Sequence, residues 1–227
     1  MAGKGALPTF ELEQTLYLQG YASVCGVDEV GRGPLAGPVV AAAVLLPFWQ
    51  WQTVPTALAG VTDSKQLSAE QRRHFVAVIQ LLALKIGIGT ASPAEIDDLN
   101  IRRATLLAME RAVAPLHLSA RACVLVDGRD LPPGLPCPAQ AIVRGDQTSL
   151  SIAAASIIAK EHRDAHMTQL ARTYPGYGWE HNSGYPTAAH RQALRTLGVT
   201  AQHRRSYSPV RAAMGTPINH EPSLFNT

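Results

Sequence analysis

Four acidic side chains stand at or just after the ends of apolar stretches of the chain, at places where a buried strand would end. They are Asp28, Glu29, Asp127 and Asp146. In α/β proteins, ligands bind at the carboxyl ends of the strands. A single carboxylate at such a place is usually a turn former or a helix cap, but three strand ends of this kind in one chain favour a shared site.

Converging carboxylates would form a site for divalent cations. Like charges at close range raise one another's pKa and destabilise the fold, and a bound cation removes that cost. Mg²⁺ and Mn²⁺ prefer carboxylate oxygens, and two such ions about 3.5–4 Å apart can bind the attacking and the leaving oxygen of a phosphodiester. Because neighbouring strand residues point to opposite faces, Asp28 and Glu29 share the site only if the strand ends or twists there, which Gly31 and Gly33 make feasible.

The segment Gly31-Arg-Gly-Pro34 follows the first two acids and could bind a phosphate-containing ligand. Glycine lets the backbone approach a ligand closely and exposes its N–H groups, and the arginine between the glycines can reach a phosphate. The same residues could equally form a plain turn between two strands. The segment is not a nucleotide-binding P-loop, whose spacing occurs nowhere in the sequence.

The elements that must position these residues are predicted to be strands interleaved with helices. Apolar and β-branched runs predict strands over residues 23–27, 39–46, 84–88, 122–126 and 140–143. Helices are predicted from 68 towards 84, from 92 to 113, from 151 to about 174 and from 187 to 197. The first two helices open with capping boxes, and the second has proline at its first position. This order predicts one α/β domain with a mixed central sheet.

The composition is that of a globular protein, since 46% of the 227 residues are hydrophobic and 16% are charged. The longest apolar run, residues 39–46, is far shorter than the roughly 20 residues of a membrane helix. Residues 1–13 lack the apolar region of a signal peptide. The three cysteines form no CxxC pair, which disfavours a disulfide framework or a zinc ribbon. We therefore expect a soluble cytoplasmic protein.

Positive charge is concentrated towards the C-terminus. Residues 144–227 carry nine Lys+Arg against five Asp+Glu, whereas residues 1–143 carry 11 against 12. Sixteen of the 20 cationic side chains are arginines, which suit planar phosphate contacts. Basic residues that could either contact backbone phosphates or remain solvated charges are Arg144, Lys160, Arg163, Arg204 and Arg205. The distribution permits a nucleic-acid partner without requiring one.

An ordered set of motifs resembles the ribonuclease HII family. The set begins with Cys25-Gly-Val-Asp-Glu-Val-Gly-Arg-Gly-Pro34 and Ala36-Gly-Pro-Val39. It continues with Asp63-Ser-Lys65, Val126-Asp-Gly128, Gly145-Asp146, Ile152-Ala-Ala-Ala-Ser-Ile157, Ala159-Lys160, Arg163-Asp164, Tyr174-Pro-Gly-Tyr-Gly178, Gly184-Tyr-Pro-Thr187 and His203-Arg204. The matches cover roughly residues 20–212, and the ordered set is much more specific than any one motif.

The resemblance implies an RNase H-like fold and a metal-dependent endonuclease that cuts the RNA strand of RNA–DNA hybrids. It also implies incision of DNA on the 5′ side of a single embedded ribonucleotide, leaving a 3′-hydroxyl and a 5′-phosphate. The four acids named above match the metal-binding acids of the family, so the implied cofactor is Mg²⁺ or Mn²⁺, with two ions during catalysis. The implied partners are hybrid duplexes and ribonucleotide-containing DNA, and we expect a monomer.

Substrate contacts are implied in the same way. Gly31, Arg32 and Gly33 match a loop whose backbone senses the ribose 2′-hydroxyl, which is how a protein distinguishes RNA from DNA at one position. Tyr185 matches a tyrosine that stacks near the RNA–DNA junction, and Lys65 a lysine near the phosphates. Arg144 and Lys160 are expected to add phosphate contacts.

The implied organisation is a single catalytic domain over residues 1–227, with a mixed central sheet flanked by helices and a C-terminal helical extension. Its parts are a core at about 20–175, a substrate-binding extension at about 176–212 and a flexible tail at about 213–227. Three residues depart from the family pattern: Ser183 and Gln66 stand where lysine is common, and Tyr207 where phenylalanine is usual. The serine at 183 is expected to weaken one phosphate contact, and the tyrosine at 207 is interpreted as a conservative change. None of the three touches the four acids, so we expect turnover to be unaffected.

Other interpretations of the sequence stay open. His162 and His166 have the spacing of a zinc pair, but Arg163 stands where a metalloprotease needs glutamate, so we expect no zinc site. A general DNA nuclease or resolvase would use the same two-metal chemistry without reading the sugar. A hybrid-binding protein without turnover would retain the fold, although four acids argue for catalysis.

Overall fold

The structure is a computed structural model that describes residues 7–215. Its centre is a five-stranded mixed sheet in the order β3-β2-β1-β4-β5. The strands are β1 Ser23–Val30, β2 Val39–Leu45, β3 Lys85–Ala91, β4 Ala122–Asp127 and β5 Ala139–Ile142. β1 pairs antiparallel with β2 but parallel with β4, and β5 continues the parallel part. The predicted α/β class with a mixed central sheet is confirmed.

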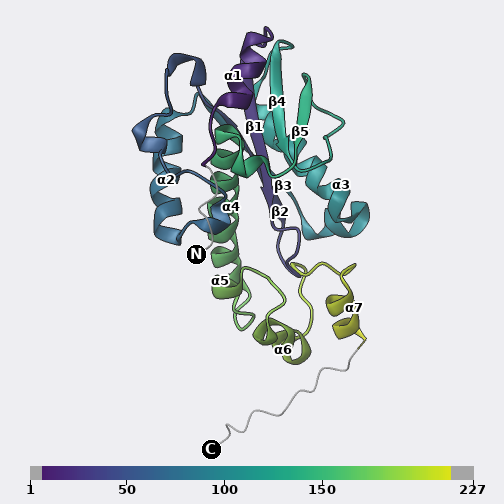
Figure 1. The fold of residues 1–227 in the computed structure, drawn as a ribbon. Coiled ribbons are helices and arrows are strands. Elements are labelled where there is room, and N and C mark those ends of the chain that lie inside the picture. The colour runs from purple at the N-terminus through teal and green to yellow at the C-terminus, as the bar shows by residue number, and fades with distance from the viewer. Residues whose placement is uncertain (1–6, 216–227) are drawn as a thin grey trace, which may run out of the picture.

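Helices cover both faces of this sheet (Figure 1). They are α1 Glu11–Leu18, α2 Ala69–Leu82, α3 Pro93–Val113, α4 Leu150–Thr173, α5 Trp179–Asn182, α6 Ala188–Leu197 and α7 Ser208–Met214. Both predicted capping boxes are present, Ser68 with Gln71 before α2 and Ser92 with Glu95 before α3. The serine accepts a bond from the third backbone N–H of the helix, and the third side chain accepts one from the serine N–H, so the start of each helix is fixed locally.

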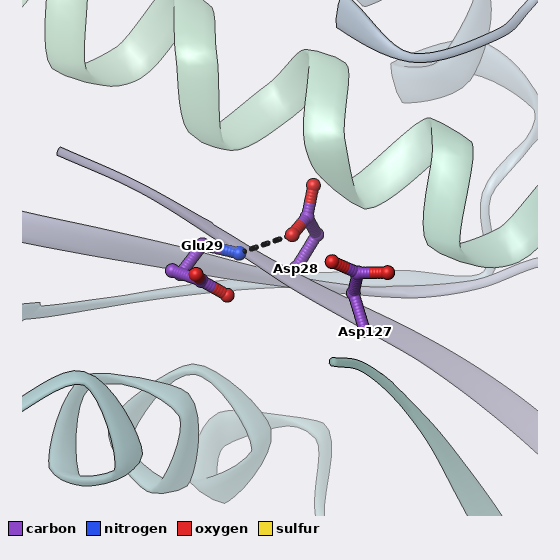
Figure 2. A group of neighbouring side chains, drawn as sticks. All are labelled: Asp28, Glu29 and Asp127. Atoms are coloured by element: carbon purple, nitrogen blue, oxygen red, sulfur yellow. Dashed lines mark hydrogen bonds between the residues drawn. The ribbon is translucent and has the colours of Figure 1, made fainter. Parts of the chain in front are cut away.

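Two apolar layers hold the sheet between its helices. One layer packs α4 against β1 and β2, and the other packs α3 against the opposite face. β2 is buried at every position because it lies between β1 and β3 with a helix on each side. Gly26 brings α4 very close to β1, since a Cβ there would stand 2.1 Å from the carbonyl carbon of Ser151. Asp28, two residues farther along on the same face of β1, is therefore positioned against α4 (Figure 2).

The C-terminal helices form a smaller cluster beyond one end of the sheet, which Figure 1 shows around α5, α6 and α7. Tyr177, Trp179 and Ala193 pack there against Met167 of α4. This is the position predicted for the helical extension. α7 extends to Met214, inside the expected tail of 213–227; residues 216–227 of that tail lie outside the described residues.

Over residues 7–215, no helix combines the length and the hydropathy needed to cross a membrane.

Candidate active site

Three of the four predicted acids meet at the carboxyl end of β1 and β4. Figure 2 shows Asp28, Glu29 and Asp127 around this strand end, with Asp28 on the side of helix α4. One carboxylate oxygen from each lies within 4.8 Å of the others. Asp28 and Glu29 come from β1 and Asp127 is the last residue of β4, so residues about a hundred positions apart build one cluster.

The hydrogen-bond ladder explains how two neighbouring strand residues can share a site. β1 stays paired with β2 as far as Val30, but its parallel pairing with β4 ends at Val27 opposite Val126. Asp28 and Asp127 are the next residues along each strand, beyond the last rung of that ladder. The carboxylate of Asp28 turns forward and accepts the backbone N–H of Glu29 at 2.7 Å. Side chains from both faces can thus turn into the space where the strands part.

The cluster is electrostatically costly without a counter-ion. Burial raises the pKa of Asp28 well above its usual value, and the charges of Glu29 and Asp127 raise it further. Burial also raises the pKa of Glu29, although the nearby Arg32 guanidinium opposes that shift. One oxygen of Asp127 accepts the N–H of Gly145 at 2.6 Å, which ties β4 to the segment carrying Asp146. A buried oxygen cluster of this kind has the donor chemistry that Mg²⁺ and Mn²⁺ require.

Asp146 stands beside the cluster rather than within it. It is 8% exposed, in the short helical turn after β5. Burial first, and then the charges of Asp63 and Asp127, raise its pKa to about 6. Burial opposes the charge of Lys65, yet the carboxylates of Asp63, Asp28 and Asp146 outweigh that effect and raise its pKa. The structure therefore places Lys65 beside two of the predicted acids, and adds Asp63, which the sequence interpretation did not select.

A comparison of thermal stability with pH tests this arrangement. The pKa of Asp146 rises from 3.8 to about 6 on folding, so between these values the metal-free folded state binds more protons than the unfolded state. Its free energy of unfolding then falls as pH rises. In EDTA, the free energy of unfolding of Asp146→Asn relative to that of the wild type should increase by about 1 kcal/mol between pH 4 and pH 7. In Mg²⁺ the variant should lose this advantage. A difference in melting temperature that is constant across this pH range would contradict the assignment.

The glycine loop and Tyr185 lie side by side. Gly31 has a φ of +93° and has room for no side chain, because a Cβ would stand 2.2 Å from Nε of Arg163. Gly33 is exposed, and its Cβ position lies 3.6 Å from the ring of Tyr185. The N–H of Leu35 donates to the carbonyl of Gly184 at 2.7 Å, which joins the two segments. The exposed Tyr185 ring thus lies beside the glycine loop, as expected for a side chain that stacks near the sugar that this loop contacts.

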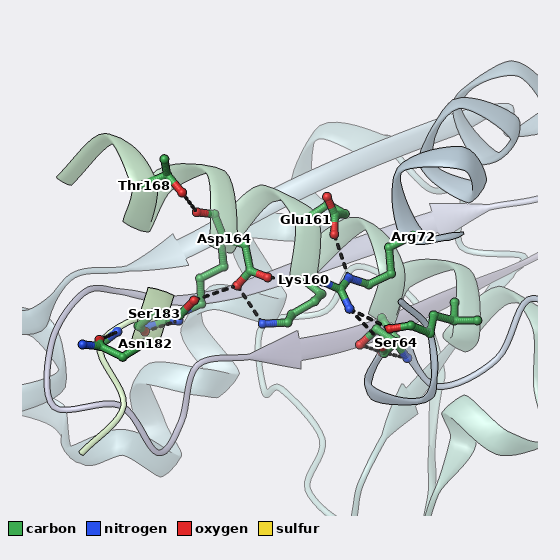
Figure 3. A network of polar contacts seen from close by, with 12 residues as sticks. Ser64, Arg72, Lys160, Glu161, Asp164, Thr168, Asn182 and Ser183 are labelled. Atoms are coloured by element: carbon green, nitrogen blue, oxygen red, sulfur yellow. Dashed lines mark hydrogen bonds and ion pairs between the residues drawn. The ribbon is translucent and has the colours of Figure 1, made fainter. Parts of the chain in front are cut away.

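The other side chains predicted to contact substrate, Arg32, Lys160 and Arg144, differ in their exposure and in their polar partners. Arg32 is 53% exposed and lies 3.4 Å from Glu29. Lys160 donates to Asp164 at 2.7 Å, and the Ser183 hydroxyl bonds the same carboxylate. Figure 3 shows this network joining the 182–183 turn to α4. Arg144 is exposed and adopts the left-handed backbone conformation just before Asp146.

Two of the basic residues considered for phosphate contact are buried, and that interpretation was wrong for them. Arg163 and Arg204 are 0% exposed and donate only to backbone carbonyls and, in the case of Arg204, to a tyrosine hydroxyl. The sequence shows their charge but not their burial. The exposed arginines that do border the acids are Arg102 and Arg129, which with Arg32 line a cleft beside Glu29 and Asp127.

Comparisons with known proteins indicate one family for this chain. A family model described as Ribonuclease HII matches residues 25–210. A curated protein named Ribonuclease HII from Ruegeria pomeroyi is 53% identical over 204 residues, covering 89% of this chain and 83% of the relative. Another of that name, from Rhodospirillum rubrum, is 57% identical over 192 residues, covering 84% and 86%. The crystal structure of the ribonuclease H2 from Pyrococcus horikoshii OT3 superimposes with a TM-score of 0.67 at 26% identity, covering 85% and 97%.

Proposed function

The chain belongs to the ribonuclease HII family, endonucleases that hydrolyse the RNA strand of RNA–DNA hybrids, and from this premise we propose that it also incises DNA 5′ of single embedded ribonucleotides by two-metal-ion catalysis. The products would carry a 3′-hydroxyl and a 5′-phosphate. The observation that carries the proposal is the meeting of Asp28, Glu29 and Asp127 at one strand end, beside a glycine loop and an exposed tyrosine.

The acidic residues would hold the cations. Asp28, Glu29 and Asp127 provide oxygens close enough for shared coordination, and Asp146 lies beside this cluster. When bound, Mg²⁺ or Mn²⁺ would activate the attacking water and neutralise charge on the leaving 3′ oxygen. The N–H groups of Glu29 and Gly145 each donate to one oxygen of Asp28 and Asp127, respectively, and so would orient these carboxylates for a bound cation.

The loop and the tyrosine would supply the preference for ribose. Exposed N–H groups at Arg32 and Gly33 can donate to the oxygen of a 2′-hydroxyl, which a deoxyribose lacks. The flat ring of Tyr185 can stack on any base or sugar, as a sequence-independent enzyme requires. Lys65 and the arginine-lined cleft beside Glu29 would contact the phosphates.

Cleavage of three matched duplexes tests the proposal. The duplexes are all-DNA, DNA with one ribonucleotide, and full RNA–DNA hybrid, each assayed with Mg²⁺, with Mn²⁺ and in EDTA. We expect cleavage of the two ribose-containing duplexes only, one cut 5′ of the single ribonucleotide, and none in EDTA. Equal cleavage of all-DNA duplex would instead favour a general nuclease, and binding without any cleavage in saturating Mn²⁺ would favour a hybrid-binding protein.

A further inference from the structure

The inner side of the glycine loop is held by two buried guanidinium groups. Arg204 donates to the carbonyls of Gly31 at 2.6 Å, of Arg32 at 3.0 Å and of Gly37 at 2.9 and 3.0 Å. Arg163 donates to the carbonyls of Ala36 at 3.1 Å and Pro38 at 3.0 Å, and also to that of Ser183 at 2.9 Å. Five carbonyl groups between residues 31 and 38 therefore point into the protein.

Neither guanidinium forms an ion pair with a carboxylate over residues 7–215. Both side chains are 0% exposed, and their direct hydrogen-bond acceptors are backbone carbonyls and, for Arg204, one tyrosine hydroxyl. Burial lowers the pKa of both groups, that of Arg163 to about 10. The rigid planar fork of arginine presents five donors to carbonyls that lie apart, whereas the ammonium of lysine presents three donors from a single nitrogen.

Tyr207 adds a contact that phenylalanine cannot make. Its hydroxyl donates to the Arg32 carbonyl at 2.6 Å and accepts a bond from Nη1 of Arg204 at 3.1 Å. Its ring also lies 5.3 Å from the Arg204 guanidinium. The segment carrying both residues is fixed to α3, because Asp97 accepts the backbone N–H groups of Arg205 and Ser206 at 2.8 Å each. The tyrosine at 207, interpreted from the sequence as a conservative change, thus adds two hydrogen bonds at the glycine loop.

The direction of these carbonyls determines the outer side of the loop. A trans peptide group points its C=O and the following N–H in opposite directions. With the carbonyls of Gly31 and Arg32 bound inside, the N–H groups of Arg32 and Gly33 are directed outward. Among the described residues neither N–H has a hydrogen-bond partner. The Tyr185 ring borders the same exposed stretch, since it lies 3.6 Å from the Cβ position of Gly33.

We propose that Arg204 and Tyr207 are positioning residues that hold the N–H groups of Arg32 and Gly33 towards the substrate sugar and so set how strongly ribose is preferred over deoxyribose. The inference rests on the proposed function, because it assumes that this loop contacts the ribose. It extends that function by giving a ribose-selecting role to two residues that never touch the substrate.

The test measures binding of two duplexes, one with a single ribonucleotide and one all-DNA, in Ca²⁺, whose looser coordination is poorly suited to catalysis. Selectivity is the ratio of the two dissociation constants. We expect Tyr207→Phe to lower the selectivity roughly threefold, as the loss of one hydrogen bond implies. Arg204→Lys is expected to lower it about tenfold. The ribonucleotide duplex should bind more weakly in each variant, while binding of all-DNA stays unchanged.

Two control variants separate positioning from general stability. Tyr177→Phe removes a similar tyrosine–carbonyl bond, to Gly198 at 2.9 Å, and should lower the melting temperature without changing the selectivity. Arg211→Lys changes an exposed arginine of α7 and should alter neither.

If Tyr207→Phe keeps the selectivity of the wild type, with or without a lower melting temperature, the inference is wrong. Tyr207→Phe alone provides the test if Arg204→Lys does not fold. Equal binding of both duplexes by the wild type would mean that this protein does not recognise ribose. That result would contradict the proposed function itself.

Discussion

Asp28→Asn is expected to abolish cleavage and, in the absence of divalent cations, to make the protein more stable. Asp28 is 6% exposed, and burial together with the charges of Glu29 and Asp127 raises its pKa well above the usual value. At neutral pH the folded protein must therefore either bury a repelled charge or hold a proton that the unfolded chain would release, and both cost free energy. Asparagine has nearly the same shape and incurs neither cost.

The two effects should be large and opposite in sign. Loss of a cation ligand should reduce kcat by at least about 10³-fold, because cation-stabilised charge is a large part of the catalysis. In EDTA at pH 7 the melting temperature should rise by about 2–4 °C, which corresponds to about 1 kcal/mol in a domain of this size. In saturating Mg²⁺ the order should reverse, since only the wild type gains full binding energy.

Asp98→Asn is the matched control, because Asp98 is exposed on α3 and lies outside the acidic cluster. It should change neither activity nor melting temperature. A fall of several degrees in metal-free Asp28→Asn would mean that Asp28 is a structural residue whose hydrogen bond to the Glu29 N–H outweighs its burial.

Local sequence signals were sufficient for most of the fold because they act over a few residues. The apolar run at 39–46 became β2, and the serine capping boxes fixed the starts of α2 and α3. The ends of elements moved by a few residues where tertiary pairing extended them. β1 continues to Val30, for example, because β2 pairs with it that far.

Features that depend on distant contacts could not be predicted in the same way. α1 is only eight residues long, and it is stabilised where Glu13, 0% exposed, accepts bonds from the Ser149 hydroxyl and the Ser151 N–H. A glutamate near the N-terminus gives no sign of such burial. Arg163 and Arg204 are similar cases, because the carbonyls that they bind come from residues 31–38 and become neighbours only in the folded chain.

The acidic site could be predicted from the sequence only in part. Apolar runs predict that Asp28 and Asp127 each end a strand, but they do not predict that the two strands pair or where the ladder between them stops. That stop, at Val27 opposite Val126, is what lets Glu29 join the group despite the alternation of side chains along a strand. Asp146 follows a turn whose path depends on the Gly145–Asp127 hydrogen bond, and it stands next to the cluster rather than in it.

Gly26→Ala is expected to damage both the fold and the site. The added Cβ would stand 2.1 Å from the carbonyl carbon of Ser151 and 2.3 Å from the backbone nitrogen of Ile152. Both atoms belong to the backbone of the first turn of α4, so no side chain can move aside and the helix and β1 must separate. Overpacking of this kind costs about 2–3 kcal/mol, which corresponds to a fall of roughly 4–12 °C in melting temperature.

The same displacement should reach the acids, because Asp28 lies two residues farther along β1 and faces α4. A shift of about 1 Å in a catalytic group can reduce the rate about 10²-fold, so kcat should fall even at temperatures where Gly26→Ala remains folded. Gly215→Ala provides the control: its Cβ would meet nothing closer than 3.8 Å, and its φ of −85° suits alanine. If Gly26→Ala melted within 1 °C of the wild type, the close contact between β1 and α4 could not be what holds Asp28 in place.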